Sequence, residues 1–135
     1  MKHYTKLQDA ALLVLRLIVA AVFLYAGIAK WSFWSAVPEG MSMSAGMVNF
    51  MKFLSIVEPL GGAALIAGFL TRWAGAGLAI IMVGAVLLMQ FAMHVGFMTP
   101  QGPGWSFPLI ILGGCIALMA FGAGSWSVDA MRKKG

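Results

Sequence analysis

The sequence predicts an all-α, polytopic membrane protein, folded as an antiparallel bundle of four transmembrane helices that forms a single domain over residues 1–135. Hydrophobic residues make up 61% of the chain and charged residues 10%, against roughly 45–50% and about 25% in soluble domains. With a mean hydropathy of +0.93, this composition excludes a soluble domain, a disordered chain and a coiled coil. A span needs roughly 20 apolar residues, so four spans leave about 55 for loops and tails, and a fifth has no room.

Four apolar stretches are each long enough to cross a bilayer, the last one only just. They run from Asp9 to Trp31, Phe50 to Leu70, Trp73 to His94 and Ser106 to Gly122. The loop of residues 32–49 separates the first two, and the Pro/Gly-rich residues 98–104 turn the chain between the last two. The second and third stretches meet at Thr71 and Arg72 almost without a loop, which predicts a tight antiparallel hairpin.

The net charge of +5 is interpreted as membrane orientation and not as nucleic-acid binding, because the basic residues stand singly or flank apolar runs. Four spans place both termini on one side. That side carries six basic residues and the other side two, Lys30 and Lys52, so the positive-inside rule predicts cytoplasmic termini. A cleaved signal peptide ending near residues 27–29 is the alternative, but Arg16 would interrupt its apolar region.

Ionisable residues within the spans indicate where function lies, because a charge at membrane depth costs roughly 2.5–3.5 kcal/mol and normally faces a partner inside the protein. Three helices each offer one polar stripe at helical spacing. The stripes are Arg16 with Lys30 on the first helix (with Ala20, Phe23 and Gly27), Glu58 with Arg72 on the second (with Gly62, Leu65 and Phe69), and Gln90 with His94 on the third.

Depth along the helices, at about 1.5 Å per residue, sorts these side chains into two levels. Glu58, Lys30, Gln90 and His94 are expected to form an outer polar cluster. Arg16 and Arg72 are expected nearer the cytoplasmic side, with Arg16 still able to reach toward Glu58. The alternatives are snorkelling for residues at span ends, and a purely structural ion pair between helices for the deeper ones.

A methionine-rich segment follows the first span. Met41, Met43 and Met47 offer soft thioether ligands that suit Cu(I), with Met51 extending the spacing. The same spacing is typical of one flexible apolar face of a helix, which is the competing interpretation.

Several ordered motifs resemble the DoxX family. Arg16-Leu17 and Phe23 to Lys30 (FLYAGIAK) are similar to the family's first helix. Glu58 to Gly62 (EPLGG) and Gly68 to Arg72 (GFLTR) are similar to its second. His94 to Phe97, Phe107-Pro108 and Gly122 to Asp129 (GAGSWSVD) resemble its later blocks. The similarity covers almost the whole chain, and the Met-rich loop is its least family-like part.

The resemblance implies a four-helix protein of the bacterial inner membrane, in a family whose members are often named as oxidoreductases and are associated with quinone chemistry. On that basis Glu58 and His94 are the expected proton-handling, catalytic residues. Arg16, Lys30, Gln90 and Arg72 are the expected quinone-binding residues. The electrons would pass through a bound quinone or a partner redox subunit.

Whether the chain is an enzyme stays open at this point. It has no GxGxxG after a strand and no CxxCH, its two histidines exclude bis-His haem ligation between spans, and its one cysteine excludes an intrachain disulfide. No cofactor is evident beyond a bound quinone. The alternatives are a non-enzymatic membrane scaffold for a partner protein, and a carrier of a small molecule or Cu(I). A homodimer is compatible with the glycine-lined faces.

Overall fold

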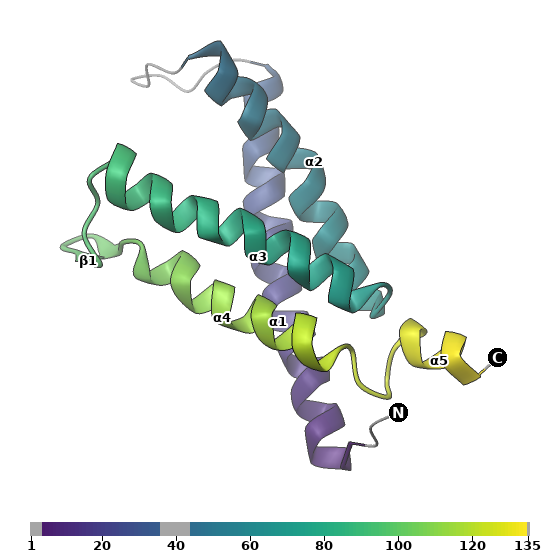
Figure 1. Ribbon diagram of the computed structural model, residues 1–135. Coiled ribbons are helices and arrows are strands. Elements are labelled where there is room, and N and C mark those ends of the chain that lie inside the picture. The colour runs from purple at the N-terminus through teal and green to yellow at the C-terminus, as the bar shows by residue number, and fades with distance from the viewer. Residues whose placement is uncertain (1–3, 36–43, 135) are drawn as a thin grey trace.

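The computed structural model describes residues 4–35 and 44–134 and is built from helices (Figure 1). Helix α1 (Lys6–Ala29) continues into a 3-10 helix, η1 (Lys30–Trp34); α2 covers Ala45–Ala67; α3 (Thr71–Leu87) continues into a π-helical turn, η2 (Leu88–Ala92). Two short strands, β1 (Met98–Thr99) and β2 (Gly102–Pro103), precede α4 (Ser106–Phe121) and a short α5 (Val128–Lys134). Within this described part, three helices are long and apolar enough to cross a membrane, and α4 is apolar but has only 16 residues.

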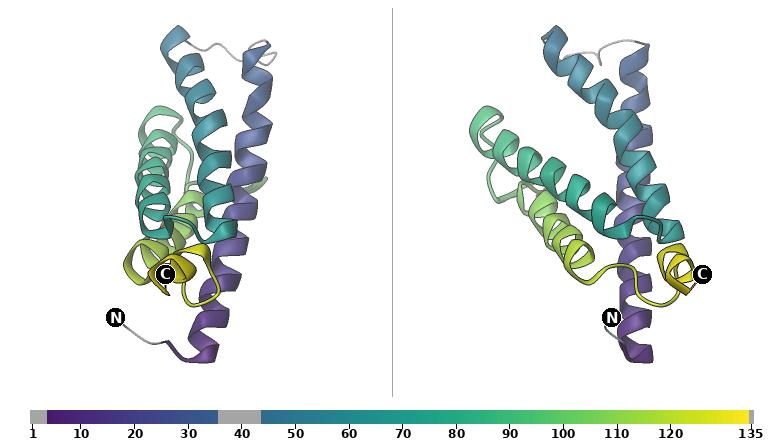
Figure 2. Two further views of the ribbon diagram at one scale, coloured as in Figure 1. Left: turned by 90° about the vertical axis from the view of Figure 1, so that its right-hand side faces the viewer. Right: turned by 45° about the vertical axis from the view of Figure 1, so that its right-hand side comes forward.

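The helices form two antiparallel hairpins, α1 with α2 and α3 with α4 (Figures 1 and 2). The hairpins meet near the end of the molecule that holds both termini, here called the terminal end, and diverge toward the opposite, far end. The predicted four-helix bundle is therefore met only in part, because the hairpins cross at an angle and do not lie side by side along their length.

Local signals explain where the helices begin and end. Thr5 caps α1 through a capping box, with its side chain accepting from Gln8 N–H while the Gln8 side chain accepts from Thr5 N–H. Helix α2 ends at Gly68, whose φ of 72° is the left-handed conformation that glycine adopts without strain. The predicted stripe of Glu58, Gly62 and Leu65 is buried as expected. Its continuation to Phe69 and Arg72 was wrong, since the helix has already ended and both side chains are exposed.

Small residues let the helices approach closely. A Cβ on Gly62 would come within 3.1 Å of the Ala20 carbonyl oxygen across the α1–α2 seam, and one on Gly75 within 3.0 Å of the Cys115 carbonyl oxygen across the α3–α4 seam. A Cβ on Gly27 would overlap the ring of Pro59. These contacts set the spacing within each hairpin, as expected where apolar burial offers little drive between helices in lipid.

We expect Gly27→Ala to destabilise the α1–α2 hairpin by about 1–3 kcal/mol, because the added methyl group must push Pro59 away. Gly77→Ala is the matched control: it lies within α3 with nothing within 4 Å of an added Cβ, and should be neutral or stabilising by up to about 1 kcal/mol. Thermal unfolding of both variants in one detergent measures the difference. Equal stability of the two variants would contradict the packing described.

Candidate functional site

A buried ion pair joins the two helices of the first hairpin. Lys30, where α1 passes into η1, places its Nζ 2.8 Å from Glu58 Oε1 on α2. The Glu58 side chain is 3% exposed and that of Lys30 23% exposed. Lys30 Nζ also donates to the Ala26 carbonyl oxygen at 3.3 Å. Among the described residues, no hydrogen-bond donor meets Glu58 Oε1 with good geometry, so this oxygen depends on the ammonium charge.

The residue after Glu58 explains how η1 is held against α2. Pro59 lies inside α2 and has no N–H, so the carbonyl oxygen four residues earlier, on Ser55, lacks its helical donor. The indole Nε1 of Trp31 donates to that oxygen at 2.9 Å. A proline thus creates a free acceptor on α2, and a tryptophan next to Lys30 occupies it.

A second indole strengthens the same junction. Trp34 Nε1 donates to the Ser55 hydroxyl at 2.8 Å, and that hydroxyl donates in turn to the Lys52 carbonyl oxygen. The Lys52 ammonium lies 5.2 Å from the centre of the Trp34 ring. We call Lys30, Glu58, Ser55 and the two tryptophans the Lys30–Glu58 site. Sequence reasoning missed Ser55, although Pro59 four residues later was the available signal.

The two other members of the predicted outer cluster lie elsewhere. Gln90 is half-buried in the π-helical turn and His94 is exposed just beyond it, with a φ of 54°. Within the described residues, no hydrogen bond or ion pair joins either side chain to Glu58. The far end of the α3–α4 hairpin, where η2 follows α3, diverges from α2 (Figure 2). The structure therefore brings Lys30 to Glu58 but makes no such contact for Gln90 or His94.

Arg16 is fully buried at the terminal end and bonds to backbone carbonyls. Its Nη1 donates to Leu65 O at 2.9 Å and Ile66 O at 3.3 Å, and its Nη2 donates to Trp126 O at 2.6 Å. The first two oxygens belong to the last turn of α2, where carbonyls lack helical donors. The guanidinium thereby links α1, α2 and the segment that follows α4, and it makes no hydrogen bond or ion pair with Glu58.

Two carboxylates complete this connection. Asp129 accepts from Leu70 N–H at 2.7 Å and from Thr71 N–H at 2.9 Å, which caps the start of α3. Asp9, 6% exposed, accepts from Ser125 N–H at 2.9 Å. We call Arg16, Asp9 and Asp129, with the backbone they bind, the terminal clamp. Arg72, predicted to bind quinone, is exposed beside it and near Gly122.

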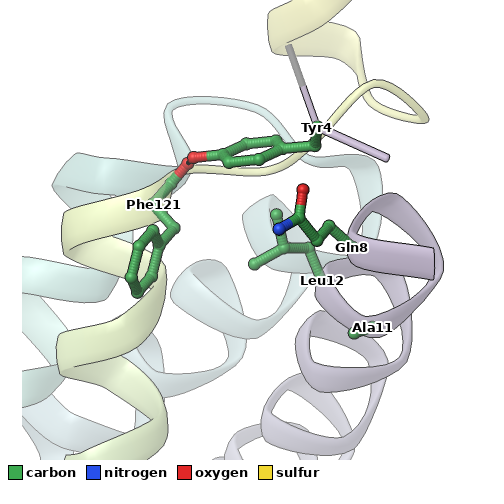
Figure 3. Close-up of a pocket in the computed structure, with 5 residues that line it drawn as sticks. All are labelled: Tyr4, Gln8, Ala11, Leu12 and Phe121. Carbon is green, nitrogen blue, oxygen red and sulfur yellow. Dashed lines mark hydrogen bonds between the residues drawn. The ribbon is translucent and has the colours of Figure 1, made fainter. Parts of the chain in front are cut away.

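Other candidate sites offer less chemistry. A pocket of about 230 Å³ at the terminal end is lined by Tyr4, Gln8, Ala11, Leu12 and Phe121 (Figure 3). Its two polar side chains are already used, since Tyr4 donates to Phe121 O and Gln8 belongs to the capping box. No group of three His, Cys, Asp or Glu side chains within residues 4–35 and 44–134 is placed to hold a metal. Met41 and Met43 lie outside the described residues; Met47 is half-buried in the first turn of α2.

Comparison with known proteins shows to which family the chain belongs. The family model for DoxX matches residues 11–94, which include Arg16, Lys30, Glu58 and the whole of α2 and α3. The chain belongs to the DoxX family. The matched range ends before α4, so the resemblance of residues 122–129 to a DoxX block lies outside it.

Two relatives extend the similarity beyond the matched range. The chain is 32% identical over 133 residues to the inner membrane protein YqjF of Escherichia coli K12, covering 96% of this chain and 97% of that protein. It is 31% identical over 135 residues to the uncharacterized membrane protein Rv3486 of Mycobacterium tuberculosis H37Rv, covering 92% and 82% of the two chains. No solved structure matches significantly. This DoxX protein is therefore a membrane protein with an inner-membrane relative.

The unequal burial of Lys30 and Glu58 predicts unequal effects of removing each charge. We expect Lys30→Met to cost roughly 3–5 kcal/mol of stability, because it leaves a deeply buried carboxylate without a counter-ion. Glu58→Gln should cost less, since the remaining ammonium is partly exposed, and the double variant should recover much of the loss of Lys30→Met. Thermal unfolding in one detergent compares them, with Lys6→Met, at an exposed lysine, as the control. A Lys30→Met variant as stable as that control would contradict the pairing.

Proposed function

We propose that this DoxX protein spans the inner membrane four times with both termini in the cytoplasm, and that its Lys30–Glu58 site binds a quinone headgroup in quinone-linked redox chemistry. The observation that carries the proposal is the incompletely satisfied ion pair. Glu58 is 3% exposed and its Oε1 receives no well-aligned hydrogen bond within the described residues, while Lys30 keeps 23% of its side chain exposed. In such a site the ammonium group of Lys30 can be reached by a ligand from its exposed side.

The chemistry of the two side chains fits a quinone. An ammonium has three N–H donors; Lys30 donates one of them to the Ala26 carbonyl oxygen and pairs with Glu58 through its charge. A further N–H can be donated to a quinone carbonyl. A carboxylate accepts hydrogen bonds and protons, so Glu58 suits the hydroxyl of the reduced quinol. Reduction of a quinone to a quinol takes up two electrons and two protons, and the electrons would come from a partner redox subunit.

The surroundings support a ligand that arrives from the bilayer. Trp31 and Trp34, on η1 directly after Lys30, are each more than half exposed and are bonded to Ser55 of α2. Their rings offer flat apolar surfaces on the same short helix as Lys30. The proposal therefore centres on Lys30 and Glu58; a catalytic role for His94 stays a prediction from sequence, and Arg16 is assigned to the terminal clamp.

Quinone retention tests the proposal directly. After extraction in mild detergent and gel filtration, we expect wild-type protein and Lys6→Gln, a variant outside the site, to carry quinone detectable by mass spectrometry. Glu58→Gln, analysed in its folded fraction, should carry about tenfold less or lower still, the scale of a lost hydrogen bond to a charged group. Absence of quinone from well-folded wild type would overturn the proposal. If a second protein co-purifies and no quinone is bound, the result would instead support the alternative of a membrane scaffold, in which the ion pair only holds η1 against α2.

Topology gives a separate prediction. Six basic residues flank the spans at the terminal end and two at the far end, which favours cytoplasmic termini. A C-terminal alkaline phosphatase fusion should be inactive, and a C-terminal green fluorescent protein fusion should fluoresce. An active phosphatase fusion would reverse the orientation and place the Lys30–Glu58 site in the cytoplasmic half.

A further inference from the structure

The terminal end is more cationic at its surface than its composition suggests. The acidic residues at this end are Asp9, which is buried, and Asp129, which is half-buried; both accept hydrogen bonds from backbone N–H groups of the terminal clamp. The basic residues Lys6, Arg72 and Arg132 are exposed. Among the described residues, none of these three forms an ion pair. The clamp thus engages both carboxylates with backbone N–H groups, while the three basic side chains stay exposed.

Two of these cations flank one turn of the backbone. Arg72 stands just after the α2–α3 turn, in the first turn of α3. Arg132, on α5, has its guanidinium 5.2 Å from the centre of the Phe69 ring, in the same turn. Helix α5 is held there because Asp129 N–H donates to Gly68 O at 2.9 Å. The clamp therefore fixes where Arg132 lies relative to Arg72.

Two exposed indoles lie at the same end of the molecule as these cations. Trp73, next to Arg72, is 78% exposed, and Trp126, whose carbonyl is held by Arg16, is 52% exposed. Tryptophan is enriched at the boundary between hydrocarbon and headgroups, where its apolar ring and N–H are both satisfied. Aromatic rings beside unpaired guanidinium groups at a membrane boundary match phospholipid headgroups with a negative phosphate.

We propose that the surface formed by Phe69, Arg72, Trp73, Trp126 and Arg132 binds anionic phospholipid, with Arg72 and Arg132 on the phosphate and the aromatic rings at the top of the acyl chains. Charge complementarity selects this occupant. Each guanidinium is attracted to the phosphate by its charge, and neither forms an ion pair with an acidic side chain of the described residues. This surface lies at the terminal end, just beyond the last turn of α2. It contains none of the residues of the Lys30–Glu58 site.

Lipid preference in nanodiscs tests the proposal. Purified protein is exchanged into discs of phosphatidylcholine with a minor share of phosphatidylglycerol, and the lipids that remain bound after gentle detergent release are counted by native mass spectrometry. We expect wild type to retain phosphatidylglycerol above its share of the disc. Arg72→Gln/Arg132→Gln should lower that preference roughly 30-fold, because each basic residue at an anionic surface contributes about fivefold.

Two further variants separate charge from folding. Arg72→Lys/Arg132→Lys keeps both charges and should keep most of the preference, whereas Lys52→Gln, a lysine outside the terminal end, should match wild type. A wild type without preference for phosphatidylglycerol overturns the proposal. So does a glutamine double variant that stays folded and keeps the wild-type preference. Loss in the lysine variant equal to that in the glutamine variant would also overturn it, by showing that packing over Phe69 and not charge is responsible.

Discussion

The structure depends on the burial of one guanidinium. Arg16 is fully buried within a span, and such a charge is tolerated only where polar partners surround it. Its partners are the carbonyl oxygens at the end of α2 and that of Trp126. Because these oxygens belong to segments far apart in sequence, satisfying Arg16 fixes the end of α2 and the path of the chain after α4. Gly68 is required beside it, since a Cβ there would overlap Ser127 and crowd the Arg16 guanidinium.

Much of the first hairpin could be predicted from the sequence, because helical periodicity is local. The spacing of Arg16, Phe23 and Gly27 predicted one buried face of α1, and these residues are buried. The same reasoning placed Lys30 near Glu58, and they form an ion pair. Composition and length predicted the apolar helices, and the tight turn at Thr71 follows α2 almost directly. These features depend on the 3.6-residue repeat and on the cost of an unpaired charge in lipid.

The remaining features depend on tertiary contacts that periodicity does not encode. Asp129 caps α3 from 59 residues away in sequence, so it looked like a tail residue near the membrane surface. Leu70 adopts a φ of 51°, which a leucine does only when its surroundings impose it. Lipid-facing and helix-facing side chains are equally apolar, so the hydropathy pattern does not encode the angle between the hairpins. The sequence therefore predicted that Gln90 and His94 join Glu58 in the outer polar cluster, whereas the far end of the α3–α4 hairpin diverges from α2.

Buried charged side chains are partnered differently at the two ends of the first hairpin, and this difference bears on function. At the terminal clamp, Asp9 and Asp129 accept from backbone N–H groups and the two Nη atoms of Arg16 donate to carbonyls, while Arg16 Nε, like Glu58 Oε1, is buried without a hydrogen-bond partner among the described residues. At the Lys30–Glu58 site the backbone is satisfied by Trp31, yet Glu58 Oε1 has only an ammonium beside it, and that ammonium stays partly exposed. A buried polar group without a full set of partners is costly to a protein that gains nothing from it. Arg16 is fully buried, whereas Lys30 keeps 23% of its side chain exposed, so the Lys30–Glu58 site is the one of the two that the proposed ligand can reach.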